Sequence, residues 1–262
     1  MEICVFNIPI SAEDSYYFII ANGVFNYYSS RILNQFKKNN PNIHFIVYFI
    51  DPLSNLTSVR AKKEIFTLDA DGYFSFDARD AADIGGNYTM NLYSKKSIPY
   101  PKEIKPNSVY FAGTNKQNRI DKIHKVYDYF IKNNIICDFH VTNVPIELMK
   151  KRNIIYNKFQ TYDDILSSMQ ECECILEIVQ PGQTGVTLRY YEAIAYNKRL
   201  ITNNTMVKNL PYYNPEYMFI FTNIEDIDIN WIKQDVVVDY EYQDDFSPIN
   251  FLEEIKMFVS SK

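Results

Sequence analysis

Residues 44–50 form an almost unbroken apolar run, HFIVYFI, which constrains the fold more than any other feature of the sequence. A strand with one solvated face alternates apolar and polar residues, whereas a strand covered on both faces is apolar throughout. Unbroken runs are therefore typical of parallel sheets with helices on both faces. The run is also far shorter than the ~18–20 residues that a transmembrane helix requires, and no apolar run in the chain is longer.

Apolar runs alternate along the chain with segments of helical periodicity. Strands are expected at 3–8, 16–20, 44–50, 74–76, 109–112, 135–141, 174–179, 199–202 and 217–221. Helices are expected at 25–36, 54–63, 78–84, 120–131, 161–169, 186–196 and 248–259. This alternation predicts parallel βαβ units, and hence an α/β protein built from two Rossmann-like domains with parallel sheets.

Residues 97–106 lack periodicity and hold three of the 11 prolines, Pro99, Pro101 and Pro106. Such segments usually link domains. We therefore expect an N-terminal domain at 1–100 and a C-terminal domain at 107–262. The last helix is a candidate to cross back to the first domain, which is short for a Rossmann-like unit.

Composition and charge exclude several classes of protein. Apolar residues make up 47% of the chain and charged residues 23%, as in ordinary globular proteins. The net charge is −5, and short basic runs such as Lys37-Lys38 and Lys62-Lys63 are typical of solvated faces. A sequence-independent nucleic-acid binder is disfavoured, whereas a peripheral contact with a membrane surface remains open.

The four cysteines and the start of the chain bear on its compartment. Cys172 and Cys174 lack a zinc-ligand spacing, and with Cys4 and Cys137 they lie in or beside apolar runs, so we expect reduced, buried thiols. The first residues have no basic stretch ahead of an apolar one, unlike a signal peptide. These features favour a cytoplasmic protein, with contact to the inner face of a membrane left open.

The most informative segment is residues 176–195, LEIVQPGQTGVTLRYYEAIA, which predicts a strand, a turn and a helix. Two of the seven glycines fall in this turn. A helix that starts there presents free N–H groups and a positive dipole end to an anion. Thr184 is a candidate N-cap and Thr187 a hydroxyl donor. On the helix face of Gly185, Arg189 could add a bidentate fork and Glu192 could accept from sugar hydroxyls.

An ordinary strand–turn–helix connection explains the same spacing, with Arg189 and Glu192 as an exposed i, i+3 pair. The segment is neither a G-x-G-x-x-G fingerprint nor a P-loop, because no lysine follows the second glycine. A nucleoside-triphosphatase is therefore excluded, and the spacing alone does not separate an anion site from a structural turn.

The segment resembles the C-terminal domain of bacterial GT-B-fold glycosyltransferases that build lipopolysaccharide and capsule. The similarity lies in the turn QPGQTG at 180–185, in TLR at 187–189, in the pair Glu192-Ala193 and in KRLITNN at 198–204. It extends to FAGT at 111–114 and SFDARDA at 75–81, and it covers most of residues 75–221. The first 70 residues match only loosely.

The resemblance implies a nucleotide-sugar donor in the C-terminal domain. Glu192 would bind the nucleotide ribose, and Gln183, Thr184, Gly185 and Arg189 would contact the diphosphate. Gly113, Thr114, Lys116 and Arg119 would face the donor from the first strand of the domain, and Gln180 and Thr187 complete the expected donor site. Many retaining enzymes of this fold carry a second glutamate eight residues before Glu192, but here that position is Thr184, so the stereochemical outcome is open.

The catalytic group would come from the N-terminal domain. An inverting enzyme needs a base near the acceptor hydroxyl, and Asp77 and Asp51, at strand ends, are the candidates, with Asp14 behind them. Each is also a typical cap of a helix or turn. Enzymes of this fold need no bound metal, and we expect neither a metal nor a cofactor.

The expected function is transfer of a sugar from a nucleotide-sugar donor to a glycan or lipid-linked acceptor in bacterial surface polysaccharide synthesis. Two alternatives are an inactive nucleotide-sugar or carbohydrate binding protein and a GT-B-fold nucleotide-sugar epimerase. Leaving-group stabilisation by the helix N-terminus and Arg189 would be the main electrostatic contribution to transfer.

Overall fold

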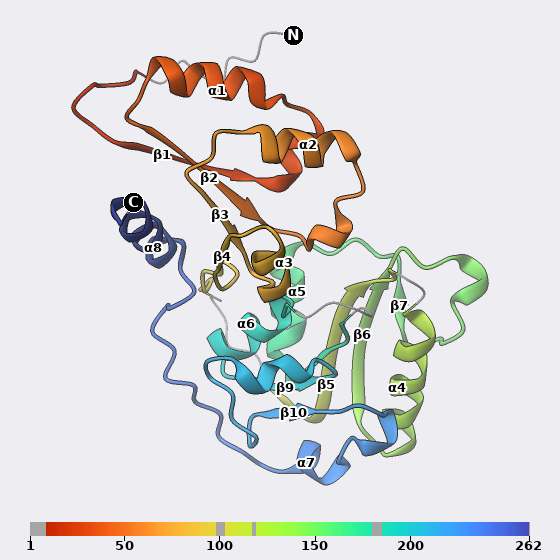
Figure 1. Ribbon diagram of the computed structural model, residues 1–262. Coiled ribbons are helices and arrows are strands. Elements are labelled where there is room, and N and C mark those ends of the chain that lie inside the picture. The colour runs from red at the N-terminus through yellow and green to blue at the C-terminus, as the bar shows by residue number, and fades with distance from the viewer. Residues whose placement is uncertain (1–8, 98–102, 117–118, 180–184, 262) are drawn as a thin grey trace. The chain divides into compact units, whose positions relative to one another are not determined.

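The computed structural model describes residues 9–97, 103–116, 119–179 and 185–261, so the strand expected at 3–8 lies outside it. The chain divides into two compact units. Unit 1 comprises the chain up to Leu92 and from Pro248 onward, and unit 2 comprises Tyr93–Ser247. Each unit holds one parallel sheet, which confirms the expected α/β class with two parallel sheets (Figure 1).

Unit 1 is built on four parallel strands in the order β1 (Tyr16–Ala21), β2 (Ile43–Phe49), β3 (Gly72–Ser75) and β4 (Asn87–Tyr88). Strand β2 contains most of the unbroken apolar run. Its residues Phe45, Val47 and Phe49 belong to a core with α1 (Ser30–Asn39) and α2 (Val59–Thr67), whereas Ile46 and Tyr48 pack with α8 (Pro248–Ser260). Helices on both faces of β2 therefore explain why the run has no polar alternation.

Side-chain caps set where the helices of unit 1 begin. The helix expected at 25–36 is split into the 3-10 turn η1 (Asn22–Asn26) and α1, whose N-cap is Ser29. The helix expected at 54–63 is likewise split into η2 (Leu53–Asn55) and α2, which begins after Ser58. In each case a serine hydroxyl accepts from the first turn, which outweighs apolar periodicity in placing the start. Helix α3 (Ala78–Asp83) begins after Asp77, as expected.

Unit 2 is a six-stranded parallel sheet in the order β10-β9-β8-β5-β6-β7. Its strands are β5 (Lys105–Thr114), β6 (Ile136–Thr142), β7 (Ile155–Tyr156), β8 (Cys172–Glu177), β9 (Arg199–Thr202) and β10 (Met218–Ile220). Its helices are α4 (Ile120–Lys132), α5 (Tyr162–Gln170), α6 (Leu188–Ala195) and α7 (Ile229–Lys233), with short 3-10 turns η3 (Ile146–Leu148), η4 (Thr205–Asn209) and η5 (Ile224–Asp226). The strand order reverses between β5 and β8, and open α/β sheets bind ligands at the carboxyl ends of strands at such a switch point.

The two faces of the unit 2 sheet are covered by different helices. Val109 and Phe111 pack with α4, and Tyr110 points to the other face, where the Arg189 guanidinium of α6 lies over its ring. His124 on α4 is buried, and its Nε2 lies 2.7 Å from the Tyr156 hydroxyl. No helix among the described residues is long and apolar enough to cross a bilayer.

Asparagine takes the place of glycine in many turns of this glycine-poor chain. Of the eight described non-glycine residues with positive φ, five are asparagines: Asn107, Asn134, Asn143, Asn157 and Asn197. Asparagine adopts the left-handed conformation more readily than other side chains that carry a Cβ. Asn143 and Asn157 shape the loops at the carboxyl ends of β6 and β7, next to the candidate site.

Lys198 connects α5 to the sheet through a buried ammonium group. Its Nζ donates to the carbonyl oxygens of Gln170, at 2.8 Å, and Cys172, at 2.7 Å. Burial lowers the pKa of Lys198 from 10.5 to about 8. The unfolded chain therefore binds more protons than the folded chain between pH 8 and 10.5, and this contribution to the free energy of unfolding rises with pH across that window.

We expect the free energy of unfolding of the wild type, relative to that of Lys198→Met, to increase by up to about 3 kcal/mol from pH 8 to about 10.5. Urea denaturation of both proteins at several pH values measures this difference. Tyrosines and cysteines titrate in the same window but are common to both proteins, so they cancel. A difference that does not change with pH would contradict the depressed pKa.

Candidate functional site

The candidate site lies at the carboxyl ends of β5 and β8, where the strand order of unit 2 reverses. The side chain of Arg119, the residue before α4, bridges the ends of these two strands. Its Nε donates to the Thr114 carbonyl at 2.8 Å and its Nη1 to the Ile178 carbonyl at 2.8 Å. A Cβ at Gly113 would lie only 2.6 Å from Arg119 Nη2, so glycine gives the guanidinium the space that it occupies. Burial lowers the pKa of Arg119.

Glu177, the last residue of β8, is a buried carboxylate that sequence reasoning missed. It accepts from Thr202 Oγ1 at 2.5 Å and from the Thr187 backbone N–H at 2.8 Å. Burial raises the pKa of Glu177. The sequence did hold a signal, because a glutamate at the end of an apolar strand, directly before a glycine-containing turn, requires buried hydrogen-bond donors.

Helix α6 begins at Leu188, two residues later than expected, and its N-cap is Thr187. The Thr187 Oγ1 accepts from the Arg189 N–H at 3.2 Å, and its carbonyl accepts from the Tyr190 N–H at 3.2 Å. The expectation that Thr184 caps this helix is therefore wrong, because the cap is Thr187. The Thr187 hydroxyl accepts in this bond and keeps its hydrogen, so its role as a donor to a ligand stays a prediction. Together with Glu177, these bonds occupy several N–H groups that the sequence reading had assigned to an external anion.

Arg189 and Glu192 form an ion pair on α6, with 2.5 Å between Nη1 and Oε2. The Arg189 side chain is 12% exposed and that of Glu192 is 0% exposed, so the alternative of a pair at the protein surface is wrong. Burial raises the pKa of Glu192, and Arg189 opposes this shift. Taking two charges out of water costs several kcal/mol per ion, so this pair is an expensive feature for a purely structural turn.

Tyr162, from outside α6, contacts Glu192 on the side away from Arg189, and Tyr93 contacts Tyr162 in turn. The Tyr162 hydroxyl, at the start of α5, donates to Glu192 Oε1 at 3.2 Å, and it lies 2.8 Å from the Tyr93 hydroxyl. Beneath the pair, the Tyr110 hydroxyl and Nδ1 of His140 are buried and make no hydrogen bond with any described residue. No local sequence signal identifies these partners, because they come from other elements.

The structure describes three of the six remaining residues expected in the donor site, and the other three lie outside the described residues. Thr114 and Gly185 lie on the strand end and turn beside α6; Thr114 is half-buried, its Oγ1 3.1 Å from that of Thr142, and Gly185 is buried. Lys116 is exposed, two residues after the end of β5. Gln180, Gln183 and Thr184 lie outside the described residues.

The two candidate catalytic aspartates have different surroundings in unit 1. Asp77 is buried and caps α3, where its Oδ1 accepts from the backbone N–H groups of Arg79 at 2.9 Å and Asp80 at 3.4 Å. Asp51 is exposed two residues after the end of β2, and Asp14 is exposed before β1. Asp77 thus has a structural role, and its catalytic role stays a prediction, as does that of Asp51.

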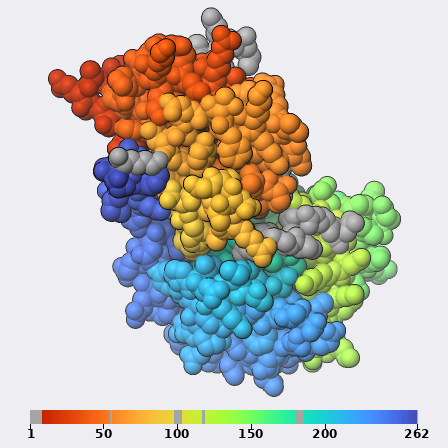
Figure 2. Space-filling view, viewed as in Figure 1, coloured from red at the N-terminus to blue at the C-terminus, as the bar shows by residue number. Residues whose placement is uncertain are grey.

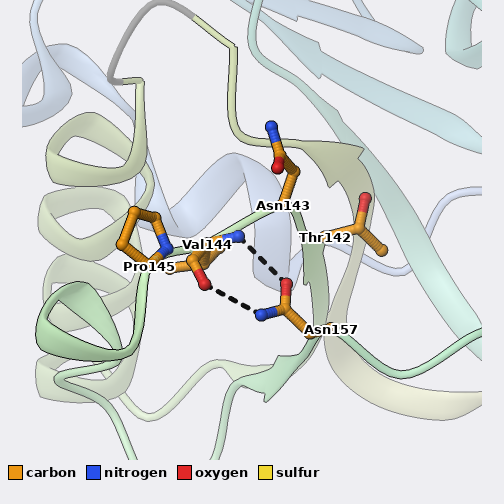
Figure 3. A pocket seen from close by; sticks show the side chains of 5 residues that line it. All are labelled: Thr142, Asn143, Val144, Pro145 and Asn157. Atoms are coloured by element: carbon orange, nitrogen blue, oxygen red, sulfur yellow. Dashed lines mark hydrogen bonds between the residues drawn. The ribbon is translucent and has the colours of Figure 1, made fainter.

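A pocket of about 520 Å³ lies at the carboxyl ends of β6 and β7, lined by Thr142, Asn143, Val144, Pro145 and Asn157 (Figure 3). The Asn157 amide fixes the wall of the pocket, because its Oδ1 accepts from the Val144 N–H at 2.9 Å and its Nδ2 donates to the Val144 carbonyl at 2.8 Å.

Among the described residues no group of three or more His, Cys, Asp or Glu side chains could hold a metal ion.

Replacement of Thr187 tests how the start of α6 is held. We expect Thr187→Ala to lower the free energy of unfolding by about 0.5–2 kcal/mol, because the first turn loses its cap. Thr187→Ser keeps the oxygen and should lie much closer to the wild type in chemical denaturation. Equal losses in the two variants would show that the methyl group, and not the cap, matters.

Several solved structures that are similar to this chain are glycosyltransferases. An alpha-glucosyltransferase in complex with UDP-glucose and DNA aligns with a TM-score of 0.62 and 13% identity over 92% of this chain and 80% of its own. S. aureus TarM, in a complex that contains UDP, aligns over 92% of this chain with a TM-score of 0.61 and 14% sequence identity. The lipopolysaccharide galactosyltransferase WaaB aligns over 93% of this chain and 75% of its own, with a TM-score of 0.54 and 14% sequence identity. This chain spans 55% of the TarM chain.

These similarities establish the fold as GT-B, the two-sheet α/β architecture of the proteins above. Identities of 13–14% establish nothing finer than the fold. No protein-family model matches the sequence, and no curated protein matches it.

Proposed function

We propose that this chain is a glycosyltransferase that transfers a sugar from a nucleotide-sugar donor to a glycan or lipid-linked acceptor in bacterial surface polysaccharide synthesis. The observation that carries the proposal is the buried Arg189–Glu192 pair beside the switch point of a GT-B fold. It combines an anion-binding fork with an acceptor of hydroxyl hydrogen bonds, the two chemistries that a nucleoside diphosphate requires. TarM and the alpha-glucosyltransferase support it, since their complexes contain UDP and UDP-glucose.

In this proposal the donor opens the Arg189–Glu192 ion pair and makes one contact with each of the two side chains. The diphosphate draws the Arg189 guanidinium away from Glu192, and the freed carboxylate accepts from the ribose hydroxyls. Arg189 thus leaves a buried charge pair for a charged ligand group, and Glu192 leaves it for two neutral hydroxyl donors, so both new contacts offset part of the cost of opening the pair. Thr114, Lys116, Gly185 and the turn residues Gln180, Gln183 and Thr184 complete the phosphate side, and Gly113 and Arg119 line its floor.

The pocket at β6 and β7 is the proposed place of the nucleobase, because it opens at the same edge of the same sheet, one strand away from β5. Asn143 and Thr142 offer the amide and hydroxyl groups that a base edge can pair with. Asn157 is committed to its own loop and would act through the shape of the wall.

For transfer itself, negative charge grows on the diphosphate as the glycosidic bond breaks, and we assign its stabilisation to Arg189 and the α6 N-terminus without a metal ion. A base in unit 1, Asp77 or Asp51, would take the proton of the acceptor hydroxyl. The proposed location is the cytoplasm, with the acceptor supplied at the inner membrane surface.

A thermal-shift screen with UDP, GDP, CMP and dTDP tests the donor site, because a ligand that binds only the folded state stabilises it. Pyrophosphate serves as the control for anion binding alone. We expect one nucleotide diphosphate to raise Tm far more than pyrophosphate, and the matching nucleotide sugar then to be hydrolysed or transferred. Binding without turnover would indicate an inactive binding protein, and sugar isomerisation without acceptor an epimerase. No shift with any nucleotide would contradict the proposal.

A further inference from the structure

Helices α1 and α2 of unit 1 lie side by side on one face of the four-stranded sheet (Figure 1). Glu64 of α2 accepts from the Ser30 N–H at 2.7 Å, and the Asn34 Nδ2 of α1 donates to the Thr67 carbonyl at 2.9 Å. Leu33 and Ile65 turn inward to the core. The contacts fix which sides of the two helices face each other and the sheet, and so which sides face outward.

The outward sides of the two helices carry charges that are almost all positive. This α1/α2 face consists of the exposed basic residues Arg31, Lys38, Arg60, Lys62 and Lys63 and the exposed apolar residues Ile32, Val59 and Phe66. Helices α1 and α2 together hold six basic residues and a single acid, Glu64, whereas the whole chain has a net charge of −5. Figure 2 shows this part of unit 1 in red and orange at the surface.

The charges of the α1/α2 face are compensated only in small part on the two helices, where Glu64 is the single acid and interacts with the charge of Arg60 without a salt bridge. The Glu64 carboxylate is committed to the start of α1, where it accepts from the hydroxyl groups of Ser29 and Ser30 as well as from the Ser30 N–H. Lys37, the sixth basic residue, pairs with Asp71 at 2.8 Å. The five exposed basic residues form no salt bridge with any residue that the structure describes, unlike the alternating charges of an ordinary solvated helix pair.

Large apolar side chains stand among these charges. Val59 is 83% exposed, Ile32 54% and Phe66 50%. A nucleic-acid backbone would use the cations and leave these side chains in water, whereas a bilayer surface takes up both: anionic headgroups attract the cations, and the acyl boundary takes the apolar groups. We propose that the α1/α2 face binds the surface of an anionic lipid bilayer.

Co-sedimentation with vesicles tests the proposal on the full chain. We expect binding to phosphatidylglycerol–phosphatidylcholine vesicles at about 0.05 M salt, a marked loss at about 0.5 M salt, and little binding to pure phosphatidylcholine. Each basic residue near an anionic surface contributes about 1 kcal/mol, or about fivefold in partitioning. Arg60→Gln with Lys63→Gln should therefore lower partitioning about 25-fold, and Val59→Ser with Phe66→Ser at least about fivefold at both salt concentrations.

Lys132→Gln with Val237→Ser is the matched control, because it removes one exposed cation and one exposed apolar residue from unit 2. It should partition as the wild type does. Equal binding by the α1/α2 variants and this control, or equal binding to neutral vesicles, would overturn the proposal. So would loss of duplex DNA binding by the same variants without any vesicle binding. The nucleotide thermal shift should be unchanged in all of them, so this inference and the donor site fail or hold separately.

Discussion

Glu192→Gln is expected to weaken the binding of the nucleotide found in the screen by about 10–100-fold. The variant keeps the shape of the side chain but removes the charge that would accept from two ribose hydroxyls, and hydrogen bonds to charged groups contribute about 1.5–3 kcal/mol. The lost ion pair acts in the opposite direction, since the nucleotide no longer has to separate Glu192 from Arg189. Isothermal titration calorimetry on the folded variant measures the net change.

Tyr162→Phe provides the control for this experiment. It removes the hydroxyl that donates to Glu192 Oε1 and leaves the carboxylate in place. We expect its nucleotide affinity to stay within about fivefold of the wild type, a smaller loss than that of a charged group. Glu192→Ala is less informative, because removing one partner of a buried ion pair destabilises a protein by about 3–5 kcal/mol. Unchanged affinity in folded Glu192→Gln would refute the ribose assignment.

The strands of both sheets were predictable because burial on two faces leaves a direct trace in the sequence. The apolar run at 44–50 matches β2 (Ile43–Phe49), and the run at 109–112 lies within β5 (Lys105–Thr114). Helix starts were less predictable. The apolar stripe that begins at Phe25 continues through a 3-10 turn, and only the Ser29 cap, together with Glu64 from another helix, fixes the start of α1.

The residues of the candidate site that share one helix were predictable, and their partners from other elements were not. Arg189 and Glu192 share a helix, so their i, i+3 spacing places them together without knowledge of the fold. Their burial depends on Tyr162 and Tyr110, which reach them from α5 and β5 and leave no trace near residue 189. Glu177 shows the cost of reading a turn alone: once its carboxylate accepts from the Thr187 N–H, that amide is no longer available to a ligand.

Arg189→Lys is expected to lower kcat by at least about tenfold, which corresponds to about 1.4 kcal/mol of activation free energy. Lysine keeps the charge but loses the planar fork that can bind two phosphate oxygens at once. As the leaving diphosphate gains charge, a fork aimed at it stabilises the transition state more than the bound donor. Nucleotide affinity should therefore change less than kcat. Single-turnover hydrolysis of the nucleotide sugar identified in the screen gives the rate.

Arg199→Lys is the matched control for the effect of shortening a buried arginine fork. Arg199 is also buried in unit 2, where its Nη1 donates to the Trp231 carbonyl at 2.6 Å and its Nη2 to the Ile232 carbonyl at 2.8 Å. Its replacement should lower Tm and leave kcat unchanged, because those bonds only anchor α7. If Arg189→Lys behaves in the same way, with a lower Tm and wild-type kcat, then the Arg189–Glu192 pair is a structural element of α6, and the leaving group must be stabilised elsewhere in the turn.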